Sequence, residues 1–599
     1  MKLFPSGRLA LIASTLAALL SACGNKSETP AGKSAANIPL PEPPCVVKCQ
    51  PGAPGGRLVV ATFGDPKTFN PITANESSSE QVYRFLFWGL VNFDWPTATP
   101  LPGLAESWSV EPDQKTWTFK LRRNSFWSDG QPLNADDVVF TWNDVIYNPD
   151  ILNTTVDLFR IDKKNFQVTK VDDYTVRAVT PEVYAPMLEA FGSVPIIPKH
   201  ILAPAVAEKR FPSAYGINSR PEMVVGAGPF KIKQFKPGQF TLLERNPYFL
   251  ETDSQGQRLP YLDAIIYTVV PNQNAVSLQF LRGESDANEQ VMPDEFEHYQ
   301  TDAKKGRFNL LNLGLGPEVY FFWFNQNTNA NPKTGKPYVD SKKLAWFRNQ
   351  KFRQAVSYAV DRASIVKAVY NGRAQPNYGY VTSANPKWQN TNIMTYPYSL
   401  DKAHELLAEI GIKDRDAEGF LKDAAGNTIE LVLNTNTGNP VRERTALMLL
   451  EDMKRLGFKV TFQAVEFNAL LDRLHNSFDY DTALLSLGGS GIDPSGSLNV
   501  IKSDAFAHFW FPNQKDPSTD WEARLDYLMN AQIKTLDFSE RKKSFDEVQS
   551  IMAEQMPFIY TVAPNSYAAI RADIGNVRPT VLSYYRVTWN AEELYFKKK

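Results

Sequence analysis

The sequence predicts an α/β protein, in which strands and helices follow one another along the chain. Apolar and polar residues alternate over 116–121, TWTFKL, which is typical of a half-buried strand. A helix with a clear capping residue follows it from Asn134, and two consecutive helices are predicted over 352–372. Strands and helices mixed in this way favour an α/β architecture.

The first predicted helix follows a turn at Asp129-Gly130. Asn134 is expected to cap it, because its side chain can accept a hydrogen bond from the first turn. Asp136 and Asp137 place carboxylates in that turn, where the helix dipole favours negative charge. Apolar residues at a spacing of four then predict the buried face: Val138, Trp142 and Ile146.

Two further helices are predicted in the second half of the chain. Asp361 is expected to cap the second of them, which stops at Gly372. The apolar residues of the first are Phe352, Ala355, Val356, Ala359 and Val360, and those of the second are Ile365, Val366, Val369 and Tyr370.

The first 22 residues have the pattern of a secretory signal. Lys2 and Arg8 precede an apolar run over 9–22, which is shorter than the about 20 residues that span a bilayer. The run ends in Leu-Ser-Ala-Cys, which resembles the lipobox of bacterial lipoproteins. The resemblance implies cleavage before Cys23, diacylation of its sulfur and anchoring to a membrane. The alternative is an ordinary signal with an unrelated cysteine.

Residues 23–56 are expected to form a tether, because prolines and small polar residues dominate and little apolar surface can be buried. The tether contains Cys45 and Cys49, the only cysteines besides Cys23. Two thiols are too few for a closed zinc site. A small disulfide loop is the expected state in an oxidising compartment, and no metal is expected.

The composition after the tether indicates a soluble globular body. Hydrophobic residues make up 43% and charged residues 22%, as in ordinary packed proteins. The formal net charge of −1 gives no electrostatic reason to expect a nucleic acid partner. No later apolar run is long enough for a membrane span, and no motif calls for a cofactor.

Ser490 lies between glycines in the stretch LSLGGSGIDPSG (485–496), a pattern that suggests a catalytic nucleophile. A nucleophile elbow needs G-x-S-x-G, and the second glycine is missing here. His404 and Glu405 begin like a zinc-protease helix, but the second histidine is absent. These incomplete motifs argue against a secreted hydrolase.

Five segments, in order, resemble family 5 of the extracellular solute-binding proteins, which serve ABC importers of the peptide and nickel type. The resemblance covers about 57–594, nearly the whole chain after the signal and tether. The segments are 104–145, VPIIPKH (194–200), VGAGPF (225–230), LRGESDA (281–287) and FRQAVSYAVDR (352–362).

This resemblance implies a two-lobed periplasmic-binding-protein fold (type II, with an extra subdomain) and a ligand cleft between the lobes. Lobe I would comprise 57–96, 223–313 and 565–599, with an inserted subdomain over 97–222. Lobe II would comprise 314–564, with the chain crossing between lobes at both ends. Gly314 and Gly316 suit a hinge, where a few residues absorb changes in φ and ψ.

The resemblance also implies ligand-binding positions in lobe II. Ser490 occupies the position where peptide-binding members carry the Asp that pairs with a peptide's amino group, and Leu487 replaces their Trp. A hydroxyl cannot form that charge-assisted bond. Asp493 could take over the role, or could serve as a turn residue before Pro494. Asn325 and Trp510 are further candidates for the wall of the cleft.

The aromatic residues near these positions have two interpretations. Tyr320, Phe322 and Phe324 lie on one face of a predicted strand and could be either core or cleft wall. The expected function is to capture a solute, with peptide as the default ligand, and to deliver it to ABC permease subunits. Oligosaccharide and metal complexes remain alternatives, because a fold does not fix its ligand. A monomer on the periplasmic or extracytoplasmic face is expected.

Overall fold

A computed structural model describes residues 38–153, 155–488 and 491–598. The chain separates into two units, Met1–Pro39 and Leu40–Lys599, and the description below concerns the second. Across the described ranges, no helix has both the length and the apolar character that crossing a bilayer requires. Cys23 lies outside the described residues.

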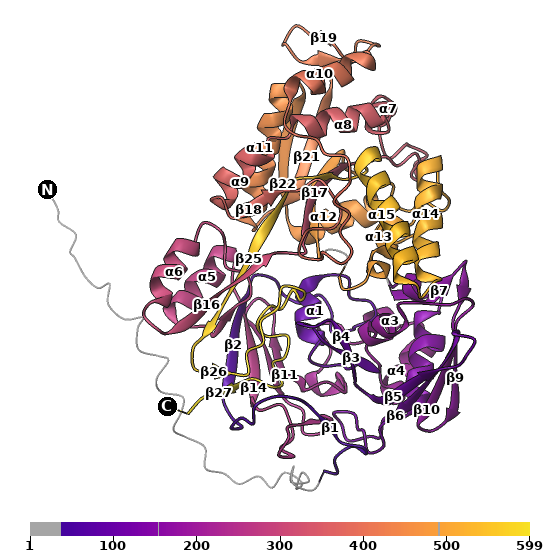
Figure 1. Cartoon of the computed structure of the whole chain (residues 1–599), viewed down its shortest axis with the longest axis vertical. Coiled ribbons are helices and arrows are strands. Elements are labelled where there is room, and N and C mark those ends of the chain that lie inside the picture. The colour runs from indigo at the N-terminus through magenta and orange to yellow at the C-terminus, as the bar shows by residue number, and fades with distance from the viewer. Residues whose placement is uncertain (1–37, 154, 489–490, 599) are drawn as a thin grey trace, which may run out of the picture. The chain divides into compact units, whose positions relative to one another are not determined.

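From residue 40 the chain forms two lobes, each built on a mixed β-sheet with helices packed against it (Figure 1). The sheet of lobe I has the order β11-β12-β14-β2-β15-β25-β16, and β18 also pairs with β25. In its centre β14, β2 and β15 run parallel. The strands are β2 (Arg57–Thr62), β11 (Phe230–Lys236), β12 (Phe240–Arg245), β14 (Ala264–Val269), β15 (Ala287–Asn288), β16 (Phe308–Leu315), β18 (Ala374–Pro376) and β25 (Val562–Arg571).

Helices flank this sheet and begin and end at recognisable residues. The Asn272 side chain accepts a hydrogen bond from the Ala275 amide and so caps α5. The same helix ends at Gly283, whose φ of 77° lies in the left-handed region that favours glycine. The helices of lobe I are α1 (Ser77–Tyr83), α5 (Gln273–Arg282) and α6 (Phe296–Ala303).

A subdomain with its own four-stranded antiparallel sheet, β5-β6-β10-β9, is inserted in lobe I. The predicted strand over 116–121 is confirmed as β6, and Asn134 caps α2, its Oδ1 accepting from the Asp136 amide. The helix continues as a π-helix over Phe140–Ile146, with the predicted apolar face buried. Elements here are β3 (Val91–Asp94), β4 (Thr99–Pro102), β5 (Ala105–Val110), β6 (Thr116–Leu121), α2 (Ala135–Val139), β7 (Arg160–Ile161), β8 (Lys164–Asn165), β9 (Gln167–Asp172), β10 (Thr175–Val179), α3 (Met187–Ser193) and α4 (Lys199–Ala207).

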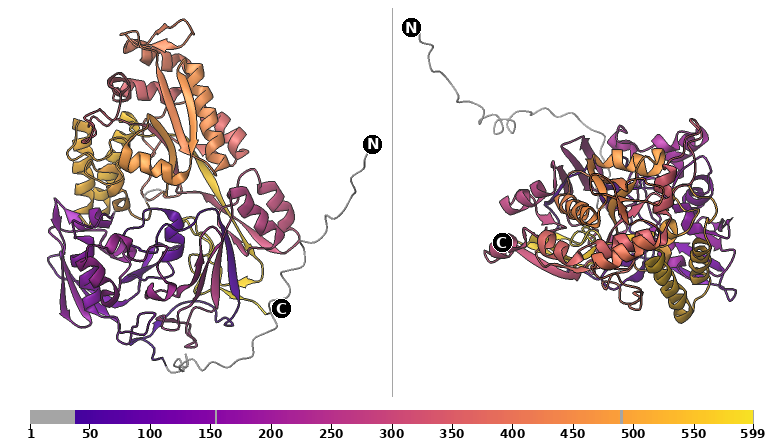
Figure 2. Two further views of the ribbon diagram at one scale, coloured as in Figure 1. Left: turned by 180° about the vertical axis from the view of Figure 1, so that it is seen from behind. Right: turned by 90° about the horizontal axis from the view of Figure 1, so that it is seen from above.

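Lobe II is built on the five-stranded sheet β22-β21-β23-β17-β24, and Figure 2 shows α11 lying along it. β22, β21 and β23 are parallel, whereas β17 is antiparallel to β23. The strands are β17 (Val319–Phe324), β21 (Glu430–Asn436), β22 (Lys459–Val465), β23 (Thr482–Leu487) and β24 (Ile559–Tyr560). The helices are α7 (Ser341–Phe347), α8 (Gln350–Ala359), α9 (Arg362–Tyr370), α10 (Leu400–Glu409), α11 (Pro440–Leu456), α12 (Phe467–Asp472), α13 (Leu498–Ile501), α14 (Asp520–Ile533) and α15 (Phe538–Gln555).

The predicted helix pair over 352–372 is confirmed as α8 and α9. Asp361 caps α9, because its Oδ1 accepts a hydrogen bond from the Ser364 amide at 3.0 Å. The helix ends one residue earlier than predicted: Asn371 already has a φ of 50° and acts as the left-handed C-cap, ahead of Gly372. Asn is the residue that most often replaces glycine in this conformation.

Strand β17 forms the centre of the core of lobe II. All six of its residues are at most 8% exposed, as expected of a strand covered on both faces. Phe324 stacks on Phe347 of α7, while Trp323 on the other face packs against Phe509 and Phe558. These aromatic side chains are therefore core residues.

Two short segments join the lobes. The chain leaves the lobe I sheet at the end of β16 and enters the lobe II sheet at β17, through residues 316–318. It returns between β24 and β25, where Thr561 alone separates the two strands. β25 then runs into the lobe I sheet, visible as the long yellow strand in Figure 1. Both connections lie side by side, since the Thr561 amide donates to the Tyr320 carbonyl at 2.9 Å.

Residues 40–56, expected to belong to an extended tether, instead pack against lobe I. β1 (Cys45–Val46) pairs in parallel with β13 (Glu251–Thr252). The Arg122 guanidinium donates to the Pro43 carbonyl at 2.6 Å. A proline-rich chain has few amide donors, so a neighbouring arginine and strand supply partners for its carbonyls. Further short ribbons are β19 (Asp414–Arg415) with β20 (Leu421–Lys422) and β26 (Ile574–Gly575) with β27 (Tyr595–Phe596).

Candidate functional site

The candidate site in lobe I lies at the carboxyl ends of its parallel strands. Ligands in α/β sheets bind at this edge, where loops follow the strands. Phe63 follows β2, and Glu289 and Gln290 follow β15, which is the neighbour of β2 in the sheet. Gln273 stands in the first turn of α5, which begins after β14.

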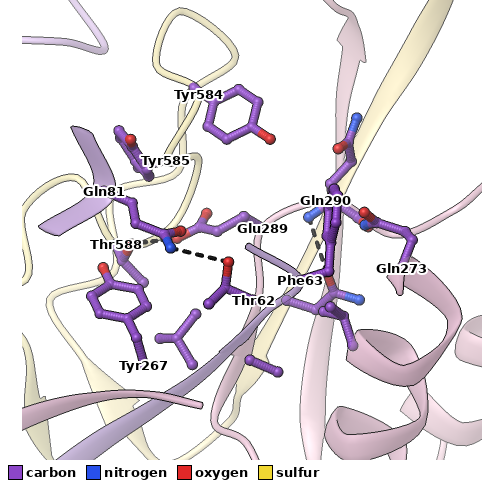
Figure 3. A pocket seen from close by; sticks show the side chains of 14 residues that line it. Thr62, Phe63, Gln81, Tyr267, Gln273, Glu289, Gln290, Tyr584, Tyr585 and Thr588 are labelled. Carbon is purple, nitrogen blue, oxygen red and sulfur yellow. Dashed lines mark hydrogen bonds between the residues drawn. The ribbon is translucent and has the colours of Figure 1, made fainter. Parts of the chain in front are cut away.

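A cavity of about 60 Å³ lies at this edge (Figure 3). One water needs about 10–15 Å³ of such space, so the cavity holds a few waters or one small group. It can therefore receive one part of a ligand but not a whole peptide. The lining includes polar side chains suited to recognition, among them Thr62, Gln81, Gln273, Glu289, Gln290 and Tyr584.

Glu289 is the acidic group of this cavity. Its carboxylate accepts hydrogen bonds from the Val587 amide at 2.9 Å and from the Thr588 hydroxyl. Burial raises the pKa of Glu289. The fixed carboxylate can accept further hydrogen bonds from a ligand, since ionised carboxylates offer about four lone-pair directions.

Amide side chains and one tyrosine complete the lobe I wall. The Gln81 amide donates to the Thr62 hydroxyl at 3.0 Å, and the Gln273 amide donates to the Gln290 carbonyl at 3.4 Å, as Figure 3 shows. Tyr584 remains 45% exposed, although it lies in a chain segment whose neighbours are buried. An exposed ring beside fixed amides provides both an apolar surface and hydrogen-bonding groups for a ligand.

The carboxyl ends of the parallel strands of lobe II carry a matching polar group. The Arg442 guanidinium donates to Asn436 at the end of β21 and to the Ser486 hydroxyl of β23, the latter at 2.8 Å. Arg442 stands in the first turn of α11, whose positive dipole end adds to its charge. A guanidinium has five N–H donors, and these two bonds leave others for a ligand oxygen.

The two walls are close enough to interact electrostatically. Burial lowers the pKa of Arg442, and the nearby phenols of Tyr320 and Tyr584 counteract that effect. Tyr584 belongs to lobe I and Arg442 to lobe II, so this influence acts between the lobes. An ion pair at 2.8 Å between Arg444 of α11 in lobe II and Asp294 of lobe I also connects the two lobes.

A buried ion pair links the first segment that joins the lobes to lobe I. Glu318, in the segment that leads into β17, pairs with Arg586, whose side chain is 1% exposed. The same guanidinium donates to the Glu289 carbonyl at 3.1 Å. Arg586 thereby connects the hinge to the loop that carries the acidic group of the cavity.

This arrangement of two lobes, a double hinge and facing polar edges has close counterparts among known proteins. The profile of the bacterial extracellular solute-binding proteins, family 5 (middle region), matches residues 99–508. That is more than half of the chain.

The chain belongs to this family.

Curated relatives of this family 5 protein span nearly its full length. A probable ABC transporter-binding protein of Deinococcus radiodurans is 28% identical over 86% of this chain and 88% of its own. The oligopeptide-binding protein AppA of Bacillus subtilis is 28% identical over 93% of this chain and 92% of its own. The solved structure of AppA with a nonapeptide superposes with a TM-score of 0.77 at 25% identity, covering 92% of this chain and 100% of AppA. The stachyose complex of MelB from Agrobacterium fabrum has the same fold, with a TM-score of 0.80 at 23% identity, covering 93% and 88%.

Asn325 of this family 5 protein does not reach the cleft, contrary to expectation. It is fully buried, and its amide donates to the carbonyls of Phe478 and Tyr480 at 3.0 and 3.1 Å. The cause is strand direction: β17 enters from the hinge at Val319, opposite Leu487, and runs away from the cleft. Asn325 therefore organises a turn at the far edge of the sheet.

Trp510 is likewise part of the core. It is fully buried, and its indole N–H donates to Glu522 at 3.1 Å. Hydroxyls of Ser518 and Thr519 also donate to that carboxylate, at 2.8 and 2.9 Å. Burial alone would raise the pKa of Glu522, but these hydrogen bonds and the neighbouring His508 lower it to about 2. The Trp510 indole is therefore hydrogen-bonded within the core of the protein and is not exposed to a ligand.

Asp493 has its carboxylate committed within the protein. It pairs with Arg541 of α15 through both oxygens, at 2.7 and 2.8 Å, and is 8% exposed. It also accepts from the Ser495 amide at 2.9 Å, the turn geometry considered from the sequence. Leu487 is half-buried at the cleft end of β23, and its contact with ligand stays a prediction. Ser490 lies outside the described residues.

Cys45 and Cys49 are both free thiols, so the expected disulfide loop is absent from the structure. β1 holds Cys45 extended beside Glu251, with its thiol near the Pro102 carbonyl, while the Cys49 thiol contacts the Tyr261 hydroxyl. Burial raises the pKa of Cys45 to about 12 and that of Cys49 to about 11. Thiols with raised pKa values are poor nucleophiles at neutral pH.

The sequence did not lead to the polar residues on both walls, although signals for three of them, Glu289, Gln290 and Arg442, were present. The matched segment LRGESDA leads into β15, so the next polar residues, Glu289 and Gln290, had to reach the carboxyl edge of the sheet. The run Asn439-Pro440 predicts a helix start, which places Arg442 in a first turn after a strand. Tyr584 carried no comparable signal. Among the described residues, no group of three or more His, Cys, Asp or Glu side chains is placed to hold a metal ion.

Proposed function

We propose that this protein captures a peptide between its lobes and delivers it to the permease of an ABC importer. Curated relatives named as oligopeptide- and dipeptide-binding proteins cover most of the chain and support this ligand class. The solved AppA structure, at 25% identity, holds a nonapeptide.

The observation that carries the proposal is the pair of facing polar edges. Lobe I offers the Glu289 carboxylate and the amides of Gln81 and Gln273, which can accept and donate. Lobe II offers the Arg442 guanidinium, a strong donor to carbonyl or carboxylate oxygens. A peptide backbone presents both N–H and C=O groups along its length, and so suits walls of both kinds.

An oligosaccharide is the second candidate, and specific features favour it. Tyr584 is an exposed ring beside amide side chains, a combination that can hold a sugar face and its hydroxyls. The periplasmic α-galactoside-binding protein of Rhizobium meliloti is 29% identical, over 61% of this chain and 54% of its own. Metal complexes are the third alternative, suggested by family resemblance alone.

Calorimetry on ligand-free protein separates the candidates. The protein is unfolded and refolded to remove any copurified molecule, and is then titrated with a nine-residue peptide mixture and, separately, with stachyose. The proposal expects saturable binding of peptide and none of stachyose. Binding of stachyose alone would overturn the peptide assignment.

We further propose that the ligand is released unchanged and that the protein is not an enzyme. Its relatives are substrate-binding proteins of transporters, which supports this assignment. Incubation of a peptide with stoichiometric protein should leave its mass unaltered. Steady accumulation of fragments that survives further purification of the protein would contradict it.

We also propose that the protein acts as a monomer on the extracytoplasmic side, anchored through acylated Cys23 after removal of 1–22. The lipobox pattern Leu-Ser-Ala-Cys supports this proposal. Two acyl chains give stable anchoring, whereas one gives only marginal binding. Cys23→Ser should release the protein from the membrane fraction, and its retention there after a high-salt wash would refute the anchor.

A further inference from the structure

A second cavity lies in lobe I, away from the hinge, where β25 ends and β16 begins. Its volume is about 350 Å³, within the about 300–1,000 Å³ range of small-molecule sites. The hinge-proximal cavity lies at the other end of β15, beyond Glu289. The two spaces share no lining residue, so the second one is separate from the site already described.

The inner part of this cavity is apolar. Phe280 of α5 and Phe308 of β16 line it, with ring centroids 5.0 Å apart in an edge-to-face arrangement. Tyr299 stacks on Phe280 from behind, with centroids 5.7 Å apart, and fixes its orientation. Leu281 adds an aliphatic side chain to the lining. A ligand that enters this space must carry an apolar body.

A buried hydroxyl in the same lining has no protein partner. Ser285 is 1% exposed, and its Oγ forms no hydrogen bond within the described structure. Most buried side-chain polar atoms in proteins are hydrogen-bonded, and leaving one unpaired is destabilising. A ligand oxygen or nitrogen in the cavity would supply the missing partner.

The rim of the cavity carries two arginines and one carboxylate. Arg307, Arg571 and Asp573 all line it. The Arg571 guanidinium is bound to Asp286 and Asp573, but Arg307 is only loosely paired, with its nearest nitrogen 3.6 Å from Asp302 and its side chain 54% exposed. A guanidinium has five N–H donors and suits a carboxylate. The negative end of α5 opposes an anion here, and Arg282 in its last turn offsets that effect.

We propose that this cavity is a binding site for a small carboxylate with an apolar body, such as a medium-chain fatty acid. The alkyl chain packs against Phe280 and Phe308, the Ser285 hydroxyl donates to the ligand, and the carboxylate pairs with Arg307. Lobe I would thus carry a ligand site that is independent of the solute captured between the lobes.

Calorimetric titration of the full-length protein with octanoate tests the proposal, with octan-1-ol as the uncharged analogue. Octanoate should bind saturably at one site, and octan-1-ol about tenfold more weakly or not at all. Arg307→Gln should weaken octanoate about tenfold and leave octan-1-ol unchanged. Lys304→Gln removes an equal charge three residues before Arg307, at a position outside the cavity lining, and should have no effect.

A second variant tests the apolar part of the site. Leu281→Trp fills the cavity and should abolish binding of octanoate while leaving binding of the interlobe solute unchanged. Absence of saturable octanoate binding by the unmodified protein would overturn the proposal. Equal weakening by Arg307→Gln and Lys304→Gln would also overturn it, because that result indicates general attraction to a basic surface. The exposed Arg307 variant is expected to fold even if the tryptophan variant does not.

Discussion

Glu318, in the first segment that joins the lobes, is paired with Arg586 from the last part of the chain, and both side chains are at most 10% exposed. Burial alone would lower the pKa of Arg586, but Glu318 and neighbouring groups hold it above its usual value. Arg586 also donates to the Glu289 carbonyl. One guanidinium thus ties the hinge to the lobe I wall of the cleft.

Arg586→Met should destabilise the protein, because it leaves the Glu318 carboxylate buried and unpaired. Loss of one partner of a buried pair costs about 3–5 kcal/mol. The measurement is urea unfolding followed by tryptophan fluorescence. Adding Glu318→Gln should recover part of the loss, since the orphaned charge is then removed. A single variant as stable as the parent would contradict a paired, buried charge at this position.

Arg442→Gln should weaken ligand binding more than it weakens the fold. The change removes a charged donor from the lobe II wall, and charge-assisted hydrogen bonds contribute about 1.5–3 kcal/mol. The expected loss of peptide affinity is about tenfold to a hundredfold. Lys454→Gln, on the same helix but distant from the cleft, serves as the matched control. Unchanged affinity in Arg442→Gln would remove this residue from the site.

A peptide with an acetylated amino terminus should bind within about tenfold of the free peptide, a difference of about 1.4 kcal/mol. Asp493 is committed to Arg541, and Ser490 carries no charge, so this loop has no free carboxylate for an ammonium group. Calorimetry on a matched pair of peptides measures the difference. A loss of a hundredfold or more would show that another carboxylate anchors the amine, and Glu289→Gln would then test the nearest one.

The stability of lobe II should fall in acid through Glu522. Its pKa is about 2 in the folded protein and near 4.5 in an unfolded chain, so the folded state favours the ionised form. The resulting stabilisation is present above pH 4.5 and is lost as pH falls from 4.5 towards 2, by up to about 1.4 kcal/mol per pH unit. Urea midpoints of the parent and Glu522→Gln between pH 7 and pH 3 measure this. In Glu522→Gln the urea midpoint should fall less between pH 4.5 and pH 3 than in the parent. The exposed Glu451→Gln variant should show the same fall as the parent. An equal fall in all three proteins would contradict this role of Glu522.

Local patterns predicted several elements to within a residue. The alternation in 116–121 and the caps at Asn134 and Asp361 depend on neighbours along the chain, which a sequence displays directly. The position of Asn325 depends on the direction of β17 relative to β23, a long-range pairing that no local pattern contains.

The binding residues were harder to predict for the same reason. Glu289 and Tyr584 are far apart in the sequence but line one cavity, and Tyr584 influences Arg442 of the other lobe only because the chain folds back between the lobes. Trp510 was a candidate because large rings occur in both cores and clefts, and composition cannot separate the two. The hydrogen bond from Trp510 to the buried Glu522 shows that this ring belongs to the core.

The most direct test of the account is the identity of the molecule that the protein carries from its own cell. The mature protein is purified without refolding, denatured, and the released small molecules are analysed by mass spectrometry alongside the Arg442→Gln variant. The account predicts peptides in stoichiometric amount from the parent and a clear reduction in the variant. Release of an oligosaccharide with no peptide, or equal peptide yields from both proteins, would contradict it.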